Sequence, residues 1–226
     1  MDQGWRIEHR RGTAQELHDL AASEPVEGRA VIVQEVVAPA IVLGSTQRVE
    51  DVDVVAATEA GVDVARRRSG GGAVLLRPGD HVWVDLVIGA QDPLADSDVG
   101  RAAWWVGEVF REALGLAGGA VGGDAVVHRG GVSDRDLARV ACFAAVGPGE
   151  ITVDGRKVLG VSQRRSRAGA RFQCVVHRSW DPQLLLVLLS PASVSQNRLR
   201  SALIGRVAAA AGPEWDVVED LVPALP

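Results

Sequence analysis

The sequence predicts a single domain of the α/β or α+β class, in which strands and helices are mixed along the chain. Segments of alternating apolar and polar residues, typical of strands, are interspersed with segments whose apolar residues recur at helical spacing. Neither a repeat nor a linker divides the 226 residues, a length that suits one large domain or two small ones. A hydrophobic content of 47% is ample for a packed core.

Helices and strands alternate in the first half of the chain. Thr13 and Glu16 form a capping-box pattern, which predicts a helix that begins there and ends near Ala22. Turn residues and apolar patterns then predict strands over 29–37, 40–43 and 62–66, a helix over 51–60 that Gly61 ends, and a hairpin of strands 73–76 and 82–88.

The second half contains the longest expected helix, over 98–116, whose apolar stripe includes Trp104, Trp105, Val109 and Phe110. Residues 118–131 are expected to be a loop, apart from Val126 and Val127. The expected elements that follow are a hairpin of strands 151–153 and 157–163 around Asp154-Gly155, a strand over 172–176, and helices from Asp181 to the end.

Composition excludes several classes of function. The formal net charge of −5 gives no sign of bulk nucleic-acid binding. Two cysteines, Cys142 and Cys174, do not form a disulfide framework and indicate a reduced, cytoplasmic protein. The N-terminus has no apolar signal core, and the longest apolar run, 184–189, is far short of the ~20 residues of a membrane helix. We therefore expect neither a nucleic-acid nor a membrane partner.

A glycine-rich segment, Arg66–Val74, lies between two expected strands and has the sequence Arg-Arg-Arg-Ser-Gly-Gly-Gly-Ala-Val. Consecutive glycines allow the backbone to lie close to a ligand and to direct several N–H groups at one anion. Adjacent arginines add charge and bidentate recognition of oxygen atoms. The segment therefore indicates a phosphate or carboxylate site, with a flexible loop and solvated arginines as the structural alternative. Its spacing matches neither a Walker A loop nor a dinucleotide fingerprint.

The only lysine of the chain, Lys157, follows the tight turn at Asp154-Gly155. It lies in an apolar strand, and Gly160 three residues later indicates a place where another group approaches the backbone. A lysine ammonium is a compact charge on a flexible stem, unlike the planar guanidinium that supplies every other basic side chain here. The pattern favours a lysine held against a phosphate or carboxylate over a residual lysine in an arginine-rich composition.

Together these segments resemble the biotin/lipoate protein ligase catalytic-domain family, and more closely its branch of lipoate–protein ligase A and octanoyltransferases. The resemblance rests on Arg66–Val74, on residues 155–165 and on the strand end Ile41–Gln47, so it spans about residues 30–190. It implies one catalytic domain over residues 1–226, with a mixed central sheet flanked by helices and related to class II aminoacyl-tRNA synthetases. The end of the chain, about 181–226, is expected to be helical.

The resemblance also implies a reaction and its participants. Such ligases activate lipoate or octanoate with ATP, with Mg²⁺ accompanying the nucleotide, and attach the acyl group to a lysine of a lipoyl carrier domain. That domain belongs to the E2 subunit of a 2-oxoacid dehydrogenase or to the glycine cleavage H protein. Lys157 is then the expected catalytic residue, and no residue is assigned to a metal. The expected binding residues are Arg66, Arg67, Ser69, Gly70, Gly71, Gly72, Ala73, Val74, Leu75 and Gly160. An apolar slot for the acyl chain is expected from Val62, Val64, Leu75, Val84 and Leu86.

Cys142 carries the alternative reaction. It forms a Cys-Phe pair 15 residues before Lys157, a spacing similar to that of octanoyltransferases that form a cysteine thioester and need no ATP. The structural alternative is a small buried cysteine, which is the interpretation favoured for Cys174. A third possibility is a non-catalytic family member that binds an acyl group or a nucleotide. The sequence places the ATP-dependent ligase first.

Two departures from the family pattern affect these expectations. The family usually has a His-Asp pair after the glycine segment, where this chain has Leu76 and Arg77. The chain also ends soon after the lysine strand, so the accessory C-terminal domain of long lipoate ligases is expected to be absent. The expected protein partners therefore include a separate accessory chain or, for a transferase, an acyl carrier protein.

Overall fold

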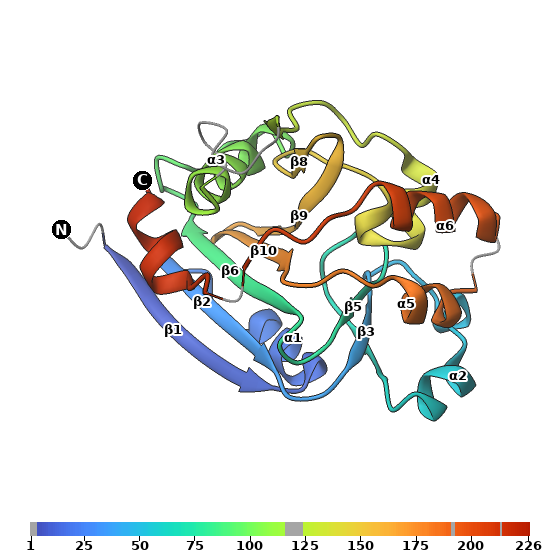
Figure 1. Ribbon diagram of the computed structural model, residues 1–226. Coiled ribbons are helices and arrows are strands. Elements are labelled where there is room, and N and C mark those ends of the chain that lie inside the picture. Colours follow the sequence, from blue (N-terminus) through green and yellow to red (C-terminus); the bar gives the residue numbers. More distant parts are fainter. Residues whose placement is uncertain (1–3, 116–123, 191–192, 213) are drawn as a thin grey trace.

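The computed structural model describes residues 4–115, 124–190, 193–212 and 214–226, which form two β-sheets with helices around them (Figure 1). The strands are β1 (Trp5–Gly12), β2 (Arg29–Val36), β3 (Ala40–Leu43), β4 (Asp63–Arg66), β5 (Val74–Leu76), β6 (His81–Gly89), β7 (Ala125–Val127), β8 (Ile151–Val153), β9 (Arg156–Ser166) and β10 (Gly169–His177). The α-helices are α1 (Ala14–Ser23), α2 (Val54–Glu59), α3 (Trp104–Ala113), α4 (Arg135–Val140), α5 (Gln183–Leu188) and α6 (Gln196–Gly205).

The larger sheet has seven strands in the order β1-β2-β6-β10-β9-β8-β7, and the smaller one has three in the order β4-β3-β5. In the larger sheet only β1 and β2 are parallel, and α1 connects them. The smaller sheet combines a parallel pair, β3 with β4, and an antiparallel pair, β3 with β5. The expected mixed sheet flanked by helices is therefore confirmed.

Each face of the larger sheet has its own core. Helix α3 and the C-terminal residues cover one face, where Phe110 of α3 packs in the same cluster as Leu86 and Phe172 (Figure 1). Helix α1 and the smaller sheet cover the other face, where Trp83 and Val175 belong to the second core. Because successive strand residues point to opposite faces, neighbouring side chains of β6 and β10 contribute to different cores. The functional side chains described below lie in the layer that contains the smaller sheet.

Local signals in the sequence locate the first helix correctly. The capping box of α1 is present, since Thr13 Oγ1 accepts a hydrogen bond from the Glu16 backbone and Glu16 Oε2 accepts one from the Thr13 backbone at 2.8 Å. The predicted helix over 98–116 begins later, because Asp98 Oδ1 accepts hydrogen bonds from Gly100 N and Arg101 N and holds a tight turn there. Residues 116–123 lie outside the described part of the chain, and they include the first part of the loop expected over 118–131.

The predicted hairpin of 73–76 and 82–88 is wrong. Strand β5 pairs with β3 in the smaller sheet, whereas β6 pairs with β2 and β10 in the larger one. The turn between them, where Arg77 and Asp80 form an ion pair at 2.5 Å, carries the chain from one layer to the other. Strand β1 and helix α4 were not predicted. No helix in the part of the chain that the structure describes is long and apolar enough to cross a membrane.

Candidate active site

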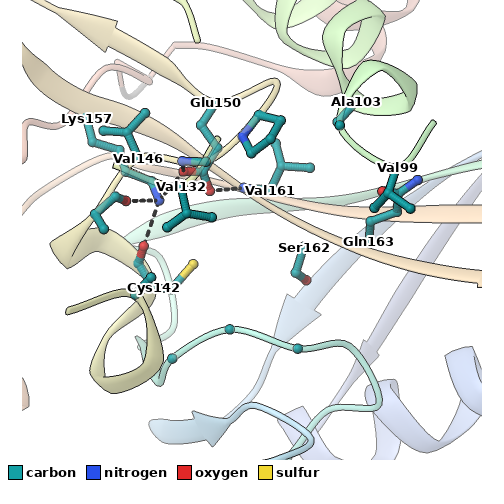
Figure 2. A pocket seen from close by; sticks show the side chains of 18 of the residues that line it. Val99, Ala103, Val132, Cys142, Val146, Glu150, Lys157, Val161, Ser162 and Gln163 are labelled. Carbon is teal, nitrogen blue, oxygen red and sulfur yellow. Dashed lines mark hydrogen bonds and ion pairs between the residues drawn. The ribbon is translucent and has the colours of Figure 1, made fainter. Parts of the chain in front are cut away.

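The glycine-rich segment, Cys142 and Lys157 meet at one cavity of about 400 Å³. We call it the main cavity. Gly70, Gly71 and Gly72 form part of its wall, Lys157 and Gln163 of β9 form another part, and Cys142 lies between them. Two of the three sequence segments that carry the family resemblance, Arg66–Val74 and 155–165, are far apart in the chain, and the structure brings them together at this cavity. Figure 2 shows the labelled side chains of the cavity, with the Cys142 sulfur directed away from Lys157 and into the open space.

Lys157 is fully buried, with a relative exposure of 1%, and its ammonium is surrounded by oxygen atoms. Lys157 Nζ donates to the backbone oxygens of Cys142 at 2.6 Å and of Ala145 at 2.9 Å, and forms an ion pair with Glu150 Oε2 at 2.6 Å (Figure 2). Three N–H groups therefore meet three acceptors. In this arrangement Lys157 holds the turn that contains Cys142 in place. To contact a ligand, the ammonium would have to give up one of its three present partners.

Glu150, which the sequence analysis missed, is the counter-charge of Lys157. It is buried, and its Oε1 accepts a hydrogen bond from Val161 N at 2.9 Å while Oε2 also accepts one from Gly147 N at 2.6 Å. Such complete hydrogen bonding is what allows a buried ion pair to persist. A charged residue just before the apolar strand β8 was the one available signal, and it did not identify a partner.

The Cys142 turn is attached to the end of the glycine segment by backbone hydrogen bonds. Cys142 N donates to Ala73 O at 2.8 Å, and Ala73 N donates to Val140 O at 3.0 Å. The side chain of Cys142 is half-buried, unlike that of Cys174, which is fully buried. Gly160 lies against this turn: a Cβ there would be 2.9 Å from the Phe143 ring and 3.5 Å from Cys142 Sγ. The expected close approach at Gly160 is thus made by the cysteine turn.

Arg67 shapes the glycine segment from inside the protein. Its guanidinium is buried and donates to Gly70 O and Gly72 O, both at 2.8 Å. Burial lowers the pKa of Arg67, and a negative charge on Cys142 acts in the opposite direction. Arg67 and Cys142 both line the main cavity, so the guanidinium faces the space next to the thiol.

The three glycines of the segment differ in backbone conformation and in the space around them. Gly71 has a φ of +93°, which favours glycine. A Cβ at Gly72 would lie 2.3 Å from Ala141 N, so Gly72 allows the cysteine turn to approach. A Cβ at Gly70 would meet nothing within 4 Å. Gly70 is thus the position of the three with free space around it.

The remaining residues expected to bind a ligand lie in several places. Arg66 donates to the backbone oxygens of Gly44 and Gln47 and supports the end of β3. Ser69 is buried, and its hydroxyl contacts Ser162 Oγ at 3.0 Å and Gln173 Oε1 at 3.1 Å. Neither residue lines the main cavity.

A second, much smaller cavity of about 30 Å³ adjoins Cys142, and we call it the side cavity. Val74 and Leu76 of β5 line it, whereas Leu75 points to the other side of the strand and lines a separate pocket with His177. Ala73 is fully buried between the glycine segment and the cysteine turn. Leu75 therefore lines neither of the two cavities that adjoin Cys142.

The five residues expected to form an acyl slot do not converge. Val62 and Val64 pack in the core around the smaller sheet, but Val84 and Leu86 point to the opposite face of the larger sheet. The reason is the alternation along β6, which directs Trp83 rather than Val84 toward Cys142. The apolar wall next to the cysteine instead consists of Val74, Leu76, Trp83, Phe143 and Val175.

The fold and this site define a family. The family model of the lipoyl protein ligase A/B catalytic domain matches residues 14–208, so the chain belongs to that family. Among curated proteins it is similar to the octanoyltransferase LipM of Clostridioides difficile (strain 630), with 29% identity over 124 residues. That match covers 54% of this chain and 44% of the relative, less than half of the relative's length.

Solved structures share the fold at low sequence identity. One is the bipartite lipoate protein ligase of an archaeal lipoylation system from Thermoplasma acidophilum, with a TM-score of 0.69, 16% identity, and coverage of 98% of this chain and 80% of that one. Another is a lipoate-protein ligase A bound with ATP, with a TM-score of 0.65, 18% identity, and coverage of 98% and 95%. At these identities the likeness establishes the fold.

Proposed function

We propose that the protein is an acyltransferase of protein lipoylation that carries the acyl group on Cys142 and passes it to a lysine of a lipoyl carrier domain. The observation that carries this proposal is the position of the Cys142 thiol, half-buried at the junction of both cavities and beside Arg67. The sequence placed the ATP-dependent ligase first. The geometry favours the transferase, because the lysine is already bonded to the turn that holds the cysteine.

The reaction takes two steps. In the first, the Cys142 thiolate attacks the carbonyl carbon of an acyl thioester on an acyl carrier protein, and the carrier sulfur leaves as a thiolate that takes up a proton. In the second, the amine of the acceptor lysine attacks the thioester on Cys142. The carbon–sulfur bond breaks, an amide forms, and the proton lost by the amine returns to Cys142 Sγ.

The chain's own residues support the charge changes of these steps. The Arg67 guanidinium lies close enough to Cys142 to interact with a negative charge there, whereas the Lys157 ammonium is paired with Glu150 and contacts the backbone oxygen of Cys142. Lys157 and Glu150 hold the cysteine turn in place through three contacts of the ammonium.

The second candidate is the ATP-dependent ligase, which the main cavity favours. Its volume of about 400 Å³ and the free space at Gly70 are suited to a nucleotide with its phosphates against Gly70–Gly72. When bound, ATP would supply the activating phosphate. In the described parts of the chain no group of three or more His, Cys, Asp or Glu side chains could hold a metal ion, so Mg²⁺ would arrive with the nucleotide. The acceptor would again be a lipoyl domain of an E2 subunit or H protein, with an accessory chain as a further partner.

Intact-protein mass spectrometry separates the candidates. Incubation with octanoyl carrier protein and no ATP is expected to add one octanoyl group to the wild type, mapped to Cys142, and none to Cys142→Ser. A ligase would instead exchange pyrophosphate into ATP in the presence of lipoate, and Cys142→Ser would retain that exchange. If the folded protein shows neither acylation nor exchange, the remaining hypothesis is a non-catalytic protein that binds acyl groups or nucleotides.

A further inference from the structure

A surface cavity of about 330 Å³ lies against the end of helix α4, and we call it the arginine cavity. Arg48, from the loop after β3, and Arg139, from α4, both line it, as do the hydroxyl residues Thr46 and Ser193. The third charged residue of its lining is Asp51. Two guanidinium groups and one carboxylate therefore leave a net positive charge facing the space.

The guanidinium groups of this cavity are unpaired. Arg48 and Arg139 are exposed, and neither guanidinium forms a hydrogen bond or an ion pair with any residue that the structure describes. The carboxylate of Asp51 instead accepts a hydrogen bond from the backbone N–H of Arg48 at 2.9 Å. Most other arginines of the chain have a carboxylate or a backbone oxygen as a partner, so these two positive charges remain available to a ligand.

Helix α4 extends the positive charge beyond the cavity. Arg135 and Arg139 are four residues apart on this helix, so they lie on the same face, and two like charges at that spacing repel each other. Arg135 is exposed and also has no partner among the described residues. The two acidic residues of this segment do not relieve the repulsion, because Arg198 pairs with Asp134 at 2.6 Å and with Asp136 at 3.9 Å.

The arginine cavity lies close to the reactive cysteine. Helix α4 separates it from the main cavity, since Ala138 lines the main cavity whereas Arg139 and Val140 line the arginine cavity. Cys142 is three residues after Arg139, and a chain spans at most about 3.6 Å per residue, so their Cα atoms lie within about 11 Å. A partner that binds Arg139 is therefore held beside the entrance to the site of the thiol.

We propose that the arginine cavity and Arg135 form the docking surface for an acidic carrier protein that delivers the acyl thioester. The inference rests on the proposed function in taking the acyl donor to be a carrier protein. Guanidinium groups bind carboxylates through two parallel hydrogen bonds, and unpaired arginines offer these bonds without first losing a partner. A chain with a formal net charge of −5 repels an acidic partner at long range, so a local cluster of positive charge directs it to one place.

The reach of the two reacting groups assigns this surface to the donor and not to the acceptor. The acceptor lysine is a short side chain, so its domain must lie directly over the main cavity. The exposed residues that line that cavity are uncharged: Gly70, Gly71, Val99 and Val132. The donor thioester is attached to the long, flexible prosthetic arm of its carrier. The carrier can therefore dock on α4, beside the main cavity, while the thioester reaches Cys142.

Binding is measured without any transfer, by fluorescence anisotropy of an acyl carrier protein whose prosthetic arm ends in a free thiol. The wild type should bind it with an affinity that falls as salt increases. Arg48→Glu combined with Arg139→Glu should weaken binding at least about tenfold, because like charges then face each other. The matched control combines Arg156→Glu and Arg167→Glu, the same charge change at two other exposed arginines without a described partner. It should bind within about twofold of the wild type.

Acylation of Cys142 gives a second readout. The Arg48→Glu/Arg139→Glu variant should react with octanoyl pantetheine, a thioester without a protein, as the wild type does, but should need more octanoyl carrier protein. Equal carrier binding by the two double variants, binding that is independent of salt, no carrier binding, or weakened binding of a lipoyl domain alone would each overturn the inference. Carrier binding that depends on these arginines, without acylation of Cys142, would support the docking surface and refute the proposed function.

Discussion

At the scale of single residues, the active site is held together by the Lys157 ammonium and the three groups that it contacts. The sequence identified Lys157 by its uniqueness and by the strand around it, but the structure adds what the ammonium touches. Glu150 lies only a few residues away in the chain, yet its role follows from contacts that span β8, β9 and the cysteine turn. A sequence pattern contains the residue types of such a network and not the distances between them.

The Lys157–Glu150 pair leads to a prediction about stability and activity together. Lys157→Met should destabilise the fold by about 3–5 kcal/mol, because it leaves the carboxylate of Glu150 buried without its cation. Adding Glu150→Gln to Lys157→Met removes the unpaired negative charge, so the double variant should regain most of the lost free energy of unfolding. Urea denaturation measures this. The double variant should nevertheless transfer acyl groups poorly, since the cysteine turn loses its ammonium. Full activity of the refolded double variant would refute a role for Lys157 in transfer.

At the scale of elements, predictions that rest on local sequence signals were correct, whereas the prediction that depends on long-range strand pairing was wrong. The capping box of α1 and the turn at Asp154-Gly155 depend on neighbouring residues, and both were predicted correctly. The assignment of β5 and β6 to different sheets depends on which strand each one meets, information that the turn between them does not carry. The same limit explains why the sequence did not separate Leu75, which lines a different pocket, from Val74 and Leu76 beside Cys142, since side-chain direction follows from the sheet.

The glycine segment gives a matched pair of substitutions at this scale. Gly72→Ala places a Cβ 2.3 Å from Ala141 N and forces the cysteine turn away, so it should cost about 1–3 kcal/mol of stability, the usual range for overpacking. Gly70→Ala has free space and a backbone that alanine accepts, so its stability should remain within about 0.5 kcal/mol of wild type. Urea denaturation of the two variants measures both. Equal stabilities would mean that the segment does not pack as described.

At the scale of the whole molecule, three histidines from different elements gather in the layer between the two sheets. His81 and His177 are paired residues of β6 and β10, and His18 covers the same face from α1. Burial lowers the pKa of His18 and His177 to about 3 and that of His81 to about 4. The active-site layer is therefore built around neutral imidazoles, which the composition of the chain does not reveal.

These three histidines predict a dependence of stability on pH. In the unfolded chain each imidazole has a pKa near 6.5, so below that value the unfolded state binds protons that the folded state does not. Stability should be constant above about pH 7 and fall as pH decreases toward 5, by up to about 1.4 kcal/mol per pH unit for each histidine. Urea denaturation between pH 7.5 and 5 measures the slope. His177→Phe should remove about a third of it, whereas the exposed control His9→Phe should leave it unchanged. A flat profile would show that the imidazoles take up protons in the folded protein.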